Sequence, residues 1–150
     1  FFIFFGLPSA GLRLSPNSAA LLALVVNFGA YGTEIIRAGI ESIHKGQVEA
    51  GTALGLSKLQ VFRYVIMKPA LRTVYPSLTS QFIYLMLTSS VVSVISANEL
   101  AAAGNDLQSA TFASFEVYIV ITLMYLVMSI GFSAIFSVIE KVAFKYPLSR

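Results

Sequence analysis

Three long stretches of this sequence carry no charged residue, and they limit what the chain can fold into. They are residues 14–33, 74–98 and 117–139 of a chain of 150 residues. As a helix, each stretch would be ~30 Å long or more, which is enough to cross the hydrocarbon core of a bilayer. A soluble domain of this size has too small a core to hide so much apolar sequence. We therefore expect an all-α, polytopic membrane helical bundle.

Composition supports the same class and excludes several others. Hydrophobic residues make up 57% of the chain and charged residues only 11%, and cysteine is absent. Without cysteine there is neither a disulfide framework nor a cysteine-based metal site. We predict no metal and no cofactor. The net charge of +3 comes from basic residues grouped as in the cytoplasmic loops of membrane proteins, so it indicates a lipid bilayer rather than nucleic acid as the partner.

We expect one transmembrane domain over residues 1–150, with spans at about 15–38, 74–97 and 115–139. Ser15 can cap the first span, with Pro16 at its first helical position, and Pro76 lies in the first turn of the second. Residues 1–5 are apolar and lack a starting methionine, so we interpret them as the last turn of a further span. The N-terminal part of the domain is then missing from this sequence.

The charges predict which side of the membrane each loop faces. The loop at 41–72 is cytoplasmic by the positive-inside rule, because residues 45–72 contain a single acid, Glu49, against five bases. Residues 98–114 contain acids but no base, and we expect them outside, with a turn at 104–106. The C-terminus is predicted to be cytoplasmic. The bases that support these assignments are Lys45, Lys58, Arg63, Lys68 and Arg72 in the loop, and Lys141, Lys145 and Arg150 near the C-terminus.

Residues 46–69 form the one long polar segment between the apolar stretches. Their pattern predicts a helix, a glycine turn and a second helix. The first helix can begin near Gln47, and Gly55 can end it in a left-handed conformation. Ser57 and Gln60 have the spacing of a capping box for the second helix. We expect Pro69 to end that helix or to begin its exit.

Within this segment, Glu49-Ala50-Gly51 followed by Gly55 resembles the EAA loop of ABC importer permeases. Residues 30–37 and 45–50 resemble the branch of that family that imports polar amino acids and opines. The resemblance covers about residues 12–146. Three features depart from it: Gly51 replaces an alanine, the closing proline is displaced to 69, and Leu87-Thr88 stands where many relatives carry Lys-Asp.

The resemblance implies a permease subunit of an inner-membrane importer, with alternating access driven by other proteins. The family's EAA loop docks into a groove on a cytoplasmic ATPase subunit, which binds the ATP. The chain itself lacks a Walker glycine-lysine loop and should not be an enzyme. The other implied partners are a second permease copy or paralogue and a periplasmic solute-binding protein. The residues that the resemblance assigns to ATPase coupling are Gly46, Gln47, Glu49, Ala50, Gly51 and Gly55.

A candidate substrate path comes from the polar content of the second span. At about 100° per residue, Gln81, Tyr84 and Thr88 fall on one face together with two serines, Ser77 and Ser80. Such groups are expensive against lipid, so they should face a wet cavity or bond to neighbouring helices. Ser89 and Ser93 belong to an opposite face suited to close helix packing.

Two isolated ionisable residues and two other functions remain open at this stage. Glu34 is either near the path or part of a helix-end group of ion pairs that joins Arg37 to Glu34 or Glu41. His44 has no neighbouring ligand set and reads as a solvated loop residue. The chain as a whole has two alternatives to transport. One alternative is a membrane assembly or scaffold protein, and the other is a non-functional truncated permease.

Overall fold

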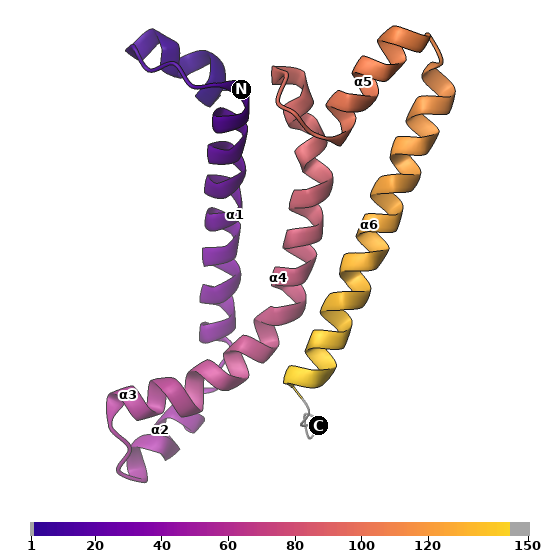
Figure 1. Cartoon of the computed structure of the whole chain (residues 1–150). Coiled ribbons are helices and arrows are strands. Elements are labelled where there is room, and N and C mark those ends of the chain that lie inside the picture. The colour runs from indigo at the N-terminus through magenta and orange to yellow at the C-terminus, as the bar shows by residue number, and fades with distance from the viewer. Residues whose placement is uncertain (1, 145–150) are drawn as a thin grey trace. The chain divides into compact units, whose positions relative to one another are not determined.

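The computed structural model describes residues 2–144, and within that range all regular structure is helical (Figure 1). This confirms the expected all-α class. Lys145 and Arg150, used above to predict the side of the C-terminus, lie outside the described residues. In chain order the elements are the π-helix η1 (Phe2–Gly6), the 3-10 helix η2 (Leu7–Ala10), α1 (Pro16–Glu41), α2 (Lys45–Ala53), α3 (Lys58–Gln60), the π-helix η3 (Val61–Met67), α4 (Lys68–Thr88), the 3-10 helix η4 (Ser89–Ile95), α5 (Leu100–Thr111) and α6 (Ser114–Ala143).

Three helical runs in the described chain are long and apolar enough to cross a membrane. They are Pro16–Glu41, Lys58–Ile95 and Ser114–Ala143, and each overlaps one of the uncharged stretches. The first begins as the sequence predicts. The Ser15 hydroxyl accepts a hydrogen bond from the Ser18 N–H at 3.2 Å, and the Ser15 carbonyl accepts one from Ala19 at 2.9 Å.

The second run differs from the prediction at both prolines. Pro69 does not end a helix, because the chain stays helical from Lys58 to Ile95 and Pro69 is the second residue of α4. Nor is Pro76 in a first turn, since it lies inside α4. Proline breaks a helix mainly by lacking an N–H and crowding the preceding turn. Next to Pro69 the π-helix η3 supplies a wider turn that accommodates the missing donor.

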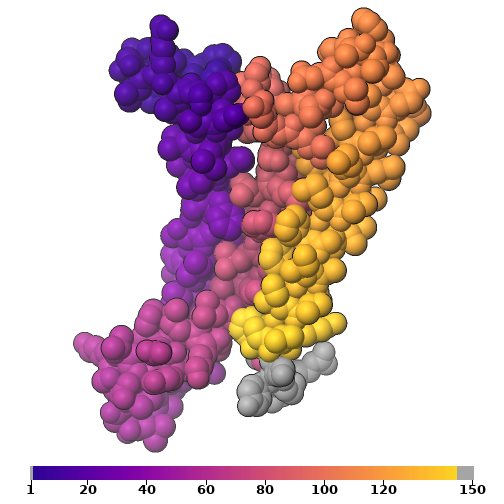
Figure 2. All heavy atoms as spheres, in the orientation of Figure 1, coloured from indigo at the N-terminus to yellow at the C-terminus, as the bar shows by residue number. Residues whose placement is uncertain are grey.

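The turn predicted at residues 104–106 is also wrong, because these residues lie within α5. The Glu99 carboxylate starts α5 by accepting hydrogen bonds from the N–H groups of Ala101 and Ala102, at 2.9 and 2.6 Å. Gly104 packs on α6, where an added Cβ would be 1.9 Å from Ile121 Cδ1. Figure 2 shows α5 packed beside the first turns of α6. The glycine therefore allows close helix contact and makes no turn.

By its contacts the described chain divides into two units. The first unit comprises residues 2–28 and 82–135, and its buried core joins α1 to the end of η4. The core residues are Ala19, Ala20, Ile95 and Ala97. Beside them the Asn17 side-chain oxygen accepts a hydrogen bond from the Asn98 N–H at 2.8 Å.

The second unit comprises residues 29–81 and 136–144. Here α1 meets α4 at Gly39, where an added Cβ would be 2.0 Å from Val74 Cγ1. The Tyr75 hydroxyl on α4 donates a hydrogen bond to the Phe136 carbonyl on α6 at 2.9 Å. The Tyr75 ring also meets the Phe144 ring edge-on, with centroids 5.5 Å apart.

The packing face predicted from Ser89 and Ser93 is not an α-helical face. Both residues lie in η4, where the turn is tighter. A spacing of four residues aligns side chains at 3.6 residues per turn but not at three. Their hydroxyls donate to carbonyls of the preceding turn, Ser89 to Met86 at 2.6 Å and Ser93 to Ser90 at 2.7 Å.

Candidate coupling element and transport cavity

The coupling element begins with a histidine cap on α2. The His44 backbone is extended, and its Nδ1 accepts a hydrogen bond from the Gly46 N–H at 3.2 Å. The first N–H groups of a helix lack partners inside the helix, so this contact satisfies one of them. His44 is exposed, as the sequence predicts, but it is a helix cap with a structural role.

The helix-turn-helix predicted from residues 46–69 is confirmed at its turn. Gly55 has φ +79°, the left-handed conformation expected of it. Ser57 and Gln60 form the capping box. The Ser57 N–H donates to Gln60 Oε1 at 2.8 Å, and the Gln60 N–H donates to the Ser57 hydroxyl oxygen at 3.4 Å. These bonds set the direction in which the chain leaves α2.

α2 lies beside the start of the helical run that follows it (Figure 1), and Gly51 is at the contact. It is the one buried residue of α2, and an added Cβ would be 3.2 Å from Val65 Cγ2 and 3.4 Å from Val61 Cγ2. An alanine there, as in the EAA motif, would make a tight contact that the valines must relieve by a small shift. Glycine at this position therefore lets α2 and residues 61–65 lie slightly closer together than alanine would.

The other residues of α2 that the resemblance assigns to coupling are more open to solvent than Gly51. Gln47, Glu49 and Ala50 are exposed, and Gly46 is half-buried. Next to them Leu54, the C-cap of α2, is a large apolar side chain that is 81% exposed. Exposed apolar groups rimmed by polar ones mark contact surfaces. Sequence reasoning passed over Leu54, although a leucine directly before the turn glycine was the available signal.

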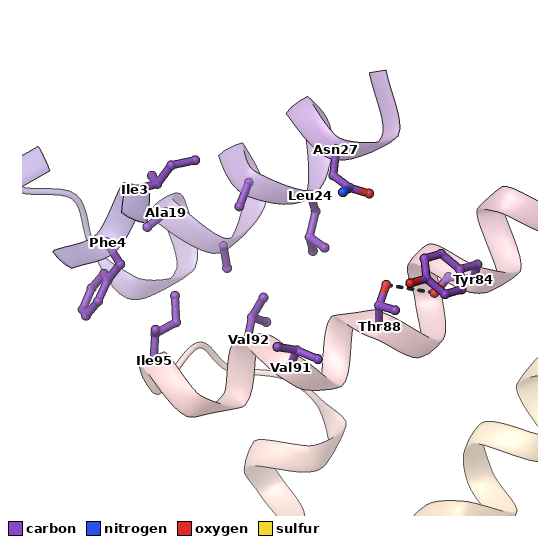
Figure 3. A pocket seen from close by; sticks show the side chains of 12 residues that line it. Ile3, Phe4, Ala19, Leu24, Asn27, Tyr84, Thr88, Val91, Val92 and Ile95 are labelled. Atoms are coloured by element: carbon purple, nitrogen blue, oxygen red, sulfur yellow. Dashed lines mark hydrogen bonds between the residues drawn. The ribbon is translucent and has the colours of Figure 1, made fainter. Parts of the chain in front are cut away.

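A cavity of about 270 Å³ lies in the first unit, between α1 and the α4–η4 run (Figure 3). Its lining is mainly apolar, with three polar residues gathered toward one end and Ile3, Phe4 and Ile95 toward the other. The polar residues are Asn27, Tyr84 and Thr88. The Thr88 hydroxyl is satisfied within its own helix by the carbonyls of Tyr84 and Leu85, at 2.9 and 3.1 Å.

Asn27 is the cavity residue that sequence reasoning missed. It is exposed near the middle of α1, a helix apolar enough to span a membrane. An amide in that position is costly against lipid unless it faces protein or water. The available signal was an amide side chain well inside the uncharged stretch at 14–33, where the other amide, Asn17, lies near the start.

The other two predicted path residues lie in the second unit and do not line this cavity. Gln81 has a buried Nε2 that finds no hydrogen-bond partner among the described residues. Glu34 is exposed and forms the predicted ion pair with Arg37, whose guanidinium also lies 3.5 Å from Glu41 Oε1. The four residues named from the sequence therefore separate into two locations.

Comparison with known proteins gives the family in which these apolar spans and the capped helix-turn-helix occur together. The family model for the binding-protein-dependent transport system inner membrane component matches residues 1–144. The chain belongs to this family of membrane proteins.

Individual relatives agree with that assignment. The probable glutamine ABC transporter permease protein GlnM of Bacillus subtilis is 38% identical over 141 residues, which are 94% of this chain and 65% of GlnM. The glutamine transport system permease protein GlnP of Escherichia coli K12 is 39% identical over 142 residues, covering 93% of this chain and 65% of GlnP. The chain thus spans about 65% of the length of these relatives.

A solved structure also resembles the chain closely. The crystal structure of an amino acid ABC transporter with histidines matches with a TM-score of 0.86 and 38% sequence identity. The match covers 93% of this chain and 65% of that one. The likeness therefore extends over nearly all of the helices described above.

Proposed function

We propose that the chain is the permease subunit of an ABC importer that moves polar amino acids or opines across the inner membrane. The observation that carries this proposal is the family match over residues 1–144, together with the glycine turn and capping box at the family's coupling position. ATP is hydrolysed on a separate ATPase subunit, so the chain itself is not an enzyme. A second permease copy or paralogue and a periplasmic solute-binding protein complete the transporter.

In this mechanism the coupling element transmits movement from the ATPase. The exposed residues of α2 and its C-cap, Gln47, Glu49, Ala50 and Leu54, dock in the ATPase groove. The Gly51 contact passes the displacement to residues 61–65, which continue into α4. Alternating access then requires that ATP binding favour one orientation of the spans over the other.

The lining of the cavity is best suited to a substrate whose side chain is polar and neutral. Among the described residues, its lining offers the Asn27 amide and the hydroxyls of Tyr84 and Thr88, but no charged group. Amide and hydroxyl groups pair well with a carboxamide, which both donates and accepts hydrogen bonds. Within the polar amino acids, glutamine therefore fits this end of the cavity best, and two relatives are named as glutamine permeases.

The test is reconstitution of the chain in vesicles with its ATPase subunit and binding protein. Uptake and ATP hydrolysis are measured against glutamine, histidine, arginine and an opine. We expect glutamine to drive both. Membrane insertion without uptake of any of these solutes, in vesicles that contain all partners, would contradict the importer proposal and favour a scaffold.

The proposed orientation has its own test, because the described residues lack cysteine and single cysteines can be labelled. We propose that the coupling loop at 41–72 is cytoplasmic and residues 98–114 are outside. In intact cells a membrane-impermeant reagent should then label Asn105→Cys and spare Lys58→Cys. The reverse pattern would show that the orientation is inverted. A third probe, Ser149→Cys, reports the C-terminus, which lies outside the described residues.

A further inference from the structure

Residues 58–72 carry a basic surface to which the coupling function assigns no role. It consists of four cations on the continuous run of α3, η3 and the start of α4, and the run contains no acid. The four are Lys58, Arg63, Lys68 and Arg72, of which the first three are exposed and Arg72 is half-buried. Within residues 2–144 the ion pairs that form belong to Arg37, so these four cations have no carboxylate partner in the described chain.

Exposed apolar and aromatic side chains lie among these cations. Leu59 is 74% exposed, Phe62 43% and Tyr64 53%. Two of the cations lie over the Tyr64 ring, with the Arg63 guanidinium carbon 5.9 Å and Lys68 Nζ 5.4 Å from its centroid. Aromatic rings with cations beside them are typical of the membrane interface, where the ring sits at headgroup level and the cation reaches the phosphates.

The length of the helical run places this surface outside the hydrocarbon core, and the run bends between α3 and α4 (Figure 1). The run from Lys58 to Ile95 has 38 residues. A hydrocarbon core of ~30 Å takes about 20 helical residues, so roughly half of the run lies outside it. Residues 74–95 are uncharged and suit the core. The excess therefore falls on the basic end.

We propose that the basic surface of residues 58–72 binds the headgroups of anionic phospholipids. Clusters of four or more cations next to a membrane-spanning helix favour anionic lipid. The valines of the same run, Val61 and Val65, face Gly51 of α2, so lipid bound to the run also sets the position of the coupling element at the membrane surface. This inference concerns lipid contact and holds whether or not the chain transports amino acids.

The absence of tryptophan from the sequence makes a direct test practical. Phe62→Trp places a single reporter beside the cations, and Leu59→Trp is a second, independent reporter. Each full chain is reconstituted in vesicles of phosphatidylcholine with a minor share of phosphatidylglycerol, and bromine is carried either by the anionic lipid or by the neutral one. Quenching by each brominated lipid measures which lipid lies next to the reporter.

We expect brominated phosphatidylglycerol to quench more than its share of the bilayer predicts, and high salt to reduce the excess. Arg63→Gln and Lys68→Gln should each lower the preference for anionic lipid about five-fold. Lys45→Gln is the matched control, because Lys45 is an exposed cation on α2 outside the surface, and it should leave the preference unchanged.

Two results would overturn the proposal. One is equal quenching by anionic and neutral lipid from both reporter positions, in protein whose helix content by circular dichroism matches the parent chain. The other is that Arg63→Gln and Lys68→Gln weaken binding of the ATPase subunit while the lipid preference stays as in the parent. In that case the surface belongs to the ATPase interface.

Discussion

Gly39 lies so close to α4 that any side chain at this position would overlap that helix. An added Cβ would be 2.0 Å from Val74 Cγ1, far inside van der Waals contact. We predict that Gly39→Ala destabilises the protein by about 1–3 kcal/mol, the usual cost of overpacking. The measurement is thermal unfolding of the purified protein in detergent.

The control is the second substitution at the same contact. Val74→Ala removes the overlapping methyl groups, so Gly39→Ala/Val74→Ala should recover stability relative to Gly39→Ala alone. Simple addition of the two single losses would show that the two residues do not pack on each other.

At Gly55 the backbone conformation limits which residues are tolerated, whereas the room for a side chain does not. Its φ is +79°, and an added Cβ would have nothing within 4 Å among the described residues. A β-branched residue in this conformation costs about 1–2 kcal/mol, whereas asparagine tolerates it better. Gly55→Val should therefore reduce transport per ATP hydrolysed, while Gly55→Asn should stay near the parent ratio. Similar ratios for both variants would exclude the turn conformation as the cause.

Bulk at position 55 tests the docking prediction separately. In a complex that still inserts, Gly55→Trp should uncouple hydrolysis from transport beyond the loss in Gly55→Val, because its ring would intrude on an ATPase seated against α2. Unchanged, substrate-stimulated hydrolysis and uptake in Gly55→Trp would mean that this turn lies clear of the ATPase.

At the scale of elements, α5 depends on one carboxylate. Glu99 caps its first turn through Ala101 and Ala102 and accepts a hydrogen bond from the Tyr125 hydroxyl of α6 at 2.8 Å. Loss of an N-cap costs about 1 kcal/mol, and loss of a hydrogen bond to a charged group costs about 1.5–3 kcal/mol.

We therefore predict that Glu99→Ala lowers thermal stability more than Tyr125→Phe, which removes only the hydrogen bond from α6 and leaves the cap. Hydrogen exchange should show faster opening of residues 100–104 in Glu99→Ala alone. Equal opening of that turn in both variants would indicate that α5 is held by α6 and not by its cap.

At the scale of the whole molecule, the cavity between α1 and the α4–η4 run, proposed as the substrate path, provides the remaining prediction. Asn27→Leu and Thr88→Val remove polar groups that line it, so they should change the preference between glutamine and other amino acids. Gln81→Ala tests the predicted path residue that lies outside this cavity. Transport selectivity and assembled yield are measured together.

Ser93→Leu is the matched substitution, because Ser93 lies on the same helical run but does not line the cavity. It should lower assembled yield without changing selectivity, because Ser93 is half-buried and leucine there is larger and loses the hydrogen bond to the Ser90 carbonyl. If Asn27→Leu and Thr88→Val also lost only assembly, the cavity would be a packing feature and not the path.

The sequence was sufficient wherever the governing interactions are local. The uncharged stretches follow from composition along continuous segments, and the Ser15 cap, the Ser57–Gln60 capping box and the left-handed Gly55 each depend on residues within a few positions of one another. Such interactions have a fixed spacing, so they can be read directly from the chain.

Tertiary structure decided the features that depend on distant partners. Gly104 lies in a helix and not a turn, and the reason for a glycine there is Ile121, 17 positions away, which leaves no room for a side chain. Asn27, Tyr84 and Thr88 line one cavity because α1 packs beside the α4–η4 run. The order of residues within α1 does not predict which of them will face that run. Close packing brings side chains together whatever their separation in sequence. Two faces of a helix with similar composition therefore differ only once one of them is buried against another helix.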